Sequence, residues 1–223
     1  MDIYEAVKVR HSVRQYLDKP LEADVKEKLE ALVAQYNAES GLHIQLVSNE
    51  PKAFSSKLAS YGNFQNVSNY FVLVGKKRKK LDELCGYYGE KLVLDAQMLG
   101  LNTCWVALTY KKIPEAFQIE KDEKLTVVIA LGYGETQGKE RKTKDGEAVC
   151  DDMQSMPKWF QRGVRYALMA PTATNQQKFK FELIDNYKVK AKTVGIGPEL
   201  KVDLGIVKYH FEIGAGVDNF EWV

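Results

Sequence analysis

The segment from Leu84 to Leu99 is apolar on nearly every side and is followed by Gly100. A helix without a polar face is stable only when it is buried on all sides. Glycine suits the left-handed conformation that ends many helices. Gly86 and Gly89 place small residues three positions apart, where another backbone can approach closely. The segment therefore predicts a buried central helix that packs against an equivalent partner helix.

Apolar spacing predicts further helices and strands around this segment. Ile3 and Val7 are four residues apart after Asp2, which is a candidate helix cap. A second helix is predicted from an apolar face of Leu21, Val25, Leu29, Leu32, Val33 and Tyr36. Strands are predicted at 43–48, 70–75 and 125–132 from their apolar and β-branched content. Helices between strands indicate an α+β fold, arranged as an α/β sandwich.

Composition narrows the class of protein. The 223 residues are 45% hydrophobic and carry a net charge of +2, which supports a sizeable core and argues against a nucleic-acid surface. The longest apolar stretches, 70–75 and 125–133, are far shorter than the roughly 20 residues that span a bilayer. The first residues show no export signal. We expect a cytoplasmic protein with neither nucleic-acid nor membrane partners.

Cysteines and histidines do not predict a metal site. Cys85, Cys104 and Cys150 have spacings that fit neither a disulfide framework nor a zinc site, and His11, His43 and His210 are isolated. Cys104 precedes Trp105 after the apolar segment, which favours a buried structural thiol over a nucleophile.

The stretch Arg10-His11-Ser12-Val13-Arg14 sets two guanidinium groups, an imidazole and a hydroxyl within five residues. Arginine offers a rigid fork of donors that matches phosphate oxygens, and a serine hydroxyl can donate to a remaining oxygen. The stretch therefore indicates a site for a phosphorylated ligand. A solvated basic turn is the alternative that these five residues leave open.

Three motifs in order resemble the nitroreductase family of FMN-dependent oxidoreductases. They are Arg-His-Ser-x-Arg at 10–14, Gly-Leu-Asn-Thr-Cys-Trp at 100–105, and Gly-Tyr-Gly at 132–134 followed by Lys-Glu-Arg at 139–141. The resemblance implies a central mixed or antiparallel sheet flanked by helices and an FMN cofactor. It also implies NADH or NADPH as transient hydride donor and a small electron-poor acceptor such as a nitroaromatic or quinone. No side chain is expected to be catalytic, because the cofactor carries the chemistry.

A fourth family motif is displaced. The family's Ala-Pro-Ser-x-x-Asn stretch follows its first motif closely, whereas here the matching residues are 170–179, as in a tandem branch of putative nitroreductases. Residues 157–184 also resemble 21–47, and 206–223 resemble 92–106, with Trp105 and Trp222 at matched ends. We expect an FMN-binding half at 1–150 and a degenerate partial repeat at 151–223, forming a monomeric pseudo-dimer or a homodimer. A plain helix stop is the alternative reading of 170–175.

The resemblance assigns the residues that would contact FMN. They are Arg10, His11, Ser12, Arg14, Gly62, Asn63, Ala107, Leu108, Lys139, Arg141, Pro171, Thr172, Ala173 and Asn175. The family also includes specialised flavin reactions, such as dehalogenation and flavin fragmentation. A flavin-binding protein without turnover remains a further alternative, because the second half lacks both basic motifs.

Overall fold

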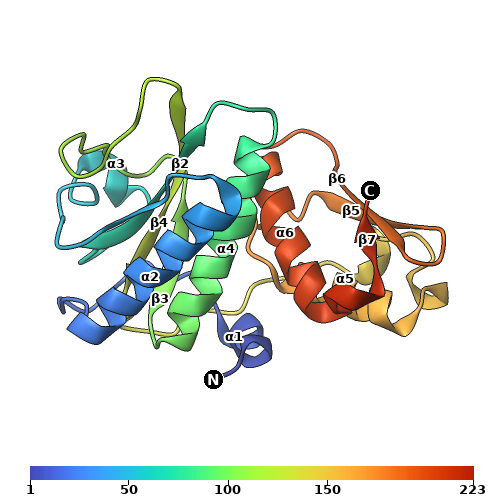
Figure 1. The fold of residues 1–223 in the computed structure, drawn as a ribbon. Coiled ribbons are helices and arrows are strands. Elements are labelled where there is room, and N and C mark those ends of the chain that lie inside the picture. Colours follow the sequence, from blue (N-terminus) through green and yellow to red (C-terminus); the bar gives the residue numbers. More distant parts are fainter.

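The computed structural model describes residues 1–223, with every side chain except that of Leu58. The chain folds into two separate sheets joined by helices (Figure 1). The first sheet is antiparallel and has the order β1 (Gln45–Val47), β2 (Asn69–Lys76), β4 (Glu123–Gly132), β3 (Asn102–Val106). The second has the order β5 (Phe179–Ile184), β6 (Lys188–Thr193), β7 (Glu221–Trp222). The α+β class expected from the sequence is confirmed.

Six α-helices are described. Two of the long ones, α4 (Leu81–Met98) and α6 (Leu200–Ala215), cross in the middle of the molecule (Figure 1). The α-helices are α1 (Ile3–Val9), α2 (Ala23–Ser40), α3 (Lys57–Ser60), α4 (Leu81–Met98), α5 (Lys158–Met169) and α6 (Leu200–Ala215). Short 3₁₀ turns lie at Gly146–Ala148, Met153–Ser155, Ala173–Asn175 and Val217–Asn219. Helix α4 packs on the first sheet, and α6 packs on β6.

Most of the expected elements are present with shifted ends. Asp2 caps α1, because its carboxylate accepts a hydrogen bond from the Glu5 backbone N–H at 2.8 Å. The strand predicted at 43–48 is shorter, at 45–47, whereas those predicted at 70–75 and 125–132 are each extended. Strand β6 was not predicted, since its alternating lysines give it little apolar character.

The apolar segment forms α4, and its end has the geometry that Gly100 predicts. Gly100 has φ +83°, its N–H donates to the carbonyl of Gln97, and the Leu101 N–H donates to that of Ala96. This pair of bonds is the Schellman motif, which satisfies carbonyl groups that a helix end leaves free. The glycine therefore turns the chain directly from α4 into β3.

The partner helix of α4 is α6 of the same chain. A Cβ atom on Gly86 would collide with the carbonyl oxygen of Val202, and one on Gly205 would collide with that of Glu83. The two backbones therefore touch at a glycine from each side. Gly89 does not belong to this contact, because it lies against the side chains of Trp105 and Leu73 on the sheet side of α4.

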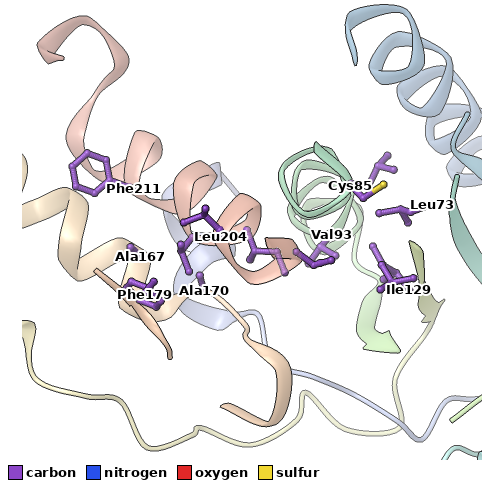
Figure 2. Packing of buried hydrophobic residues seen from close by; sticks show 14 of the residues in the cluster. Leu73, Cys85, Val93, Ile129, Ala167, Ala170, Phe179, Leu204 and Phe211 are labelled. Carbon is purple, nitrogen blue, oxygen red and sulfur yellow. The ribbon is translucent and has the colours of Figure 1, made fainter. Parts of the chain in front are cut away.

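One hydrophobic core runs through both sheets (Figure 2). Figure 2 shows its members stretching from the first sheet across α4 and α6 to α5 and β5: Leu73, Ile129, Val93, Leu204, Ala167 and Phe179. A second cluster covers the opposite face of the first sheet and takes the alternate residues of β2. Strand β2 is buried on both faces, which explains its unbroken apolar sequence.

The two sheets share part of one topology. In each, a strand after a helix pairs antiparallel with the next strand, and a long crossing helix then leads to a third strand, β3 or β7. In the first sheet β4 stands between β2 and β3, whereas in the second β7 pairs directly with β6, in parallel. Strands β2 and β3 are also parallel, since both run antiparallel to β4. The second sheet thus has the first sheet's arrangement without a counterpart of β4.

Within the described part of the chain, every helix is too short or too polar to cross a membrane.

Candidate functional site

The arginine stretch forms an extended segment beside β3. The Arg10 N–H closes α1 by donating to the carbonyl of Ala6, and the Val13 N–H then donates to that of Thr103 at 3.0 Å. This pairing fixes the direction of the side chains. Arg10 is buried, with 3% of its surface exposed, whereas Arg14 is exposed.

Two adjoining cavities lie along this segment. The first, here called the α6 cavity, has a volume of about 250 Å3. Its lining includes Ser12, Arg14, Cys104 to Thr109, Val127, Pro171 to Thr174, Pro198, Glu199, Val202, Asp203 and Ile206. The second, here called the arginine cavity, has a volume of about 490 Å3. Its lining includes Arg10 to Gln15, Asn63, Thr136, Gly138, Lys139, Arg141, Pro171, Thr172, Thr174 and Asn175.

The two cavities collect almost all of the residues assigned from the sequence. They share Ser12, Arg14, Pro171, Thr172 and Thr174. Of the fourteen assigned residues, Gly62 is outside both linings. It lies against the ring of Phe64 and the hydroxyl of Thr109, a residue of the α6 cavity. Segments far apart in the sequence, at 10–14, 107–108, 139–141 and 171–175, therefore meet at one place.

The arginine cavity holds two guanidinium groups with unused donors. The Nε atoms of Arg10 and Arg141 are both buried without a hydrogen-bond partner. Burial, together with the nearby charge of Arg10, lowers the pKa of Arg141 to about 10. The carboxylate of Glu90 lies 3.8 Å from the Arg10 Nε. Both arginines also line a further cavity, together with Arg165. An anion bound beside the two guanidinium groups would therefore meet positive charge and free N–H donors.

Arg141 also joins its own loop to the end of α5. Its Nη2 donates to the carbonyl oxygens of Leu168 at 2.9 Å and Ala170 at 2.6 Å, at the end of α5. These bonds hold the loop at 139–144, here called the basic loop, against the start of the segment at 171–175. Lys139 in the same loop is exposed. Burial and the two arginines lower the pKa of His11, which favours its uncharged form at neutral pH.

The α6 cavity has a different character. Its lining joins the end of β3 to Pro171–Thr174 and to the first turns of α6, and it is mainly apolar with a few polar groups. Such a lining suits a flat aromatic ligand. Cys104 is buried, as expected, and burial raises the pKa of its thiol, so that it carries no charge at neutral pH.

The segment at 171–177 has an irregular backbone. Helix α5 ends at Met169, so the helix stop that the sequence allowed is present. The chain then places Thr174, Asn175 and Gln177 in the left-handed region, with φ of 50°, 55° and 45°. A plain helix stop does not require three such residues within four positions, because each costs free energy without glycine.

Sequence reasoning missed three buried polar residues. Glu90 on α4 accepts hydrogen bonds from the indole N–H of Trp105 at 2.9 Å and from His210 on α6 at 2.8 Å. Asp203 on α6 lines the α6 cavity. Asp203 stands between Val202 and Leu204, and His210 stands between Tyr209 and Phe211. That isolation is the signal that could have found these two, because a buried polar group needs partners.

Among the described side chains, no group of three or more histidine, cysteine, aspartate or glutamate residues could hold a metal ion.

Structural comparison relates the fold to solved proteins. A putative nitroreductase from Thermotoga maritima superposes with a TM-score of 0.69 at 24% identity, covering 96% of this chain and 83% of that one. An FMN-dependent nitroreductase from Clostridium difficile gives a TM-score of 0.50 at 19% identity, covering 68% and 96%. A putative nitroreductase from Desulfovibrio desulfuricans, solved in complex with FMN, gives 0.51 at 15% identity, covering 67% and 95%.

These identities establish similarity of fold. No functionally curated protein matches the sequence. The sequence profile described as "Putative TM nitroreductase" matches residues 2–215, nearly the whole length of the protein. Because that match includes the arginine stretch, both crossing helices and the segment at 171–175, the chain belongs to this nitroreductase family.

Proposed function

We propose that the protein is an FMN-dependent oxidoreductase. It would take hydride from NADH or NADPH and pass it to a small electron-poor acceptor such as a nitroaromatic or a quinone. The observation that carries the proposal is the pair of adjoining cavities. One offers buried guanidinium groups with free donors, and the other offers a mainly apolar slot. A phosphate attached to a flat ring system needs this combination.

The residues present fit FMN in three respects. Arg10, Arg141 and Lys139 would hold the phosphate, because the buried Nε atoms of Arg10 and Arg141 have no partner inside the protein. Ser12 and Arg14 line both cavities and would meet the part of the ligand between them. A cation beside the flavin ring would stabilise the negative charge that reduction places there.

Bound FMN would supply the hydride chemistry, and the protein would hold and tune it. Ala107 and Leu108 line the α6 cavity just after β3 and would border the ring. Pro171, Thr172 and Ala173 would border it from the second half of the chain, while Asn175 lines the arginine cavity.

We further propose that one chain provides a complete site as a pseudo-dimer. The contacts between α4 and α6 are reciprocal, because Gly86 of α4 meets the backbone of α6 and Gly205 of α6 meets the backbone of α4. The second sheet repeats the arrangement of the first without β4. Both observations support descent of the two halves from a shared unit, in which 171–175 reaches the site from within the same chain.

The visible absorption spectrum tests the proposed activity. Purified protein supplied with FMN should retain a bound flavin after desalting, and anaerobic NADPH or NADH should bleach it. A bound flavin that neither donor bleaches would refute the oxidoreductase and favour a flavin protein without turnover. A protein that binds no FMN would refute the cofactor assignment, and Arg10 to Arg14 would then be a basic surface segment.

A further inference from the structure

Asp203 is a buried carboxylate that touches the segment at 171–177 twice. It lies in the first turn of α6 with 5% of its surface exposed. Its Oδ1 accepts a hydrogen bond from the Ala173 backbone N–H at 2.9 Å, and its Oδ2 accepts one from the Gln176 side-chain amide at 2.7 Å. One side chain of α6 therefore holds both a backbone and a side-chain group of the segment.

The segment needs such support because its backbone is strained. Thr174, Asn175 and Gln177 all have positive φ, a conformation that disfavours residues other than glycine. Strained residues persist when the surrounding structure holds them in place. Without restraint, the segment would relax to another conformation and the wall that it forms in both cavities would change.

The opposite side of the segment is held by the basic loop. The Lys142 carbonyl accepts from the Asn175 side chain at 2.8 Å, and the Lys144 backbone N–H donates to the Gln177 side chain at 2.9 Å. This loop continues directly from Lys139 and Arg141. The segment is thus clamped between the loop that lines the arginine cavity and the helix that lines the α6 cavity.

The orientation of the Gln176 amide is fixed by a second acceptor. Its Nε2 also donates to the carbonyl of Pro198 at 2.7 Å. A flipped amide would turn its oxygen toward that carbonyl, so Gln176 cannot instead accept a bond from residue 203. An asparagine at position 203 has only one acceptor oxygen, whereas both groups that face it are N–H donors. Its amide nitrogen would therefore face one of these donors, and one of the two bonds would be lost.

We propose that Asp203 is a positioning residue: its carboxylate holds Ala173 and Gln176, and thereby keeps Pro171–Asn175 folded against the α6 cavity. The proposal rests on the proposed function only for its effect on FMN. The two hydrogen bonds of Asp203 are present in the protein without any ligand.

The ionisation of Asp203 makes the restraint sensitive to pH. Burial and the charge of Glu199, one turn earlier, raise the pKa of this carboxyl to about 6, although the hydrogen bonds from Ala173 and Gln176 act in the opposite direction. Arg14 is the cation that lines the same cavity. The charged form accepts the two bonds more strongly than the protonated form. The segment should therefore loosen as pH falls through about 6.

Amide hydrogen exchange of the ligand-free protein tests the restraint. In the wild type, the protection factor of the Ala173 amide should fall between pH 7.5 and pH 5, relative to that of Phe181, whose N–H donates to the Val149 carbonyl. Asp203→Asn should lower Ala173 protection at pH 7.5 by at least about tenfold, because the Ala173 N–H loses its charged acceptor and one of the two bonds that hold the segment is lost. It should also abolish the pH dependence.

Glu199→Gln is the matched control, since it removes a carboxyl from the same cavity wall without a bond to the segment. It should leave Ala173 protection at pH 7.5 within about twofold of the wild type, well short of the effect of losing a charged hydrogen bond. Asp203→Asn with wild-type protection would overturn the proposal. If that variant does not fold, an Ala173 amide in the wild type that shows no pH dependence relative to Phe181 would overturn it equally.

FMN affinity provides the second readout. The FMN dissociation constant of Asp203→Asn, divided by that of the wild type, should be large at pH 7.5 and approach one near pH 5. The ratio is used because the titration of the FMN phosphate affects both proteins equally and cancels. Altered exchange without any FMN binding would refute the proposed function and leave the restraint intact. Normal FMN binding with unaltered exchange and a ratio near one would refute the role of Asp203 alone.

Discussion

Glu90 of α4 and Glu212 of α6 have reciprocal partners across the contact between their two helices. Each accepts an indole N–H from the tryptophan of the strand that follows its own helix, Trp105 at 2.9 Å and Trp222 at 2.7 Å. Each also accepts a bond from the opposite helix, Glu90 from His210 and Glu212 from the hydroxyl of Tyr87. The matched tryptophans that suggested an internal repeat thus make matched contacts.

Removing the Glu90 side chain should lower the stability of the protein strongly, whereas replacing its carboxylate by an amide should have a smaller effect. Glu90→Ala should lower the free energy of unfolding by about 3–5 kcal/mol, because it leaves the indole N–H of Trp105 without a partner and the buried Arg10 without its counter-charge. Glu90→Gln should cost much less. Its oxygen can accept from Trp105, and its amide can donate to a His210 that places its own proton on Nδ1, facing the Tyr166 carbonyl. Urea unfolding of both variants measures the difference, and equal losses would contradict this account.

Stability should decrease in mild acid because of His210. Burial lowers its pKa below the ordinary value of 6.5, although the hydrogen bond to Glu90 acts in the opposite direction. The unfolded chain therefore takes up the proton first, and the contribution of His210 is complete above pH 6.5 and is lost as pH falls. Urea unfolding at pH 7.5 and pH 5.5 should show a smaller loss for His210→Gln than for the wild type. An identical loss in the two proteins would exclude His210 as the cause.

The glycine contact should make Gly205→Ala strongly destabilising. The added Cβ would meet the backbone at Glu83 and Tyr87, which cannot move as a flexible side chain could. We expect a loss of at least about 1–3 kcal/mol, the usual cost of overpacking. Gly195→Ala is the control for backbone strain alone, since Gly195 has φ +70° and open space around it. Its loss should be about 1 kcal/mol. Thermal unfolding that ranks the control as more damaging would argue against a close helix contact.

FMN binding should depend on Arg141. Arg141→Ala should weaken the affinity by about 1.5–3 kcal/mol, the range for hydrogen bonds to charged groups. Arg14→Ala should have an effect of similar size, because Arg14 lines both cavities. Lys142→Ala is the neighbouring control, because the contacts of Lys142 with the segment involve its backbone carbonyl. Fluorescence titration gives the three constants, and wild-type affinity in both arginine variants would place the phosphate elsewhere.

A complete site within one chain predicts a simple stoichiometry. Light scattering during size exclusion should give a mass near 25.3 kDa, and absorbance should give one FMN per chain. A dimer that loses FMN when it dissociates would instead show that 171–175 acts on the neighbouring chain.

Local patterns were sufficient for most of the fold. The stretch at 84–99 was predicted as a helix because it is apolar on nearly every side, and it forms most of α4; Gly100 follows the helix end because it tolerates a positive φ. Strand β5 ends the stretch 157–184, just as β1 ends the stretch 21–47 that it resembles in the sequence. Strand β6 and the first turns of α6 were missed, because lysines and a glycine-rich turn conceal their apolar pattern.

The sequence by itself determined the family and the α+β class, and thirteen of the fourteen residues that it assigned to the ligand line one of the two cavities. These follow from short motifs whose chemistry is local: a fork of arginines, a capping glycine, a run of β-branched residues. Only the tertiary structure decided which residues meet. It placed α6 of the same chain against α4, left the Nε atoms of Arg10 and Arg141 without partners, and joined Asp203 to Ala173 and Gln176. The physical reason is that close helix contacts and buried polar pairs depend on how distant segments pack, which no local pattern specifies.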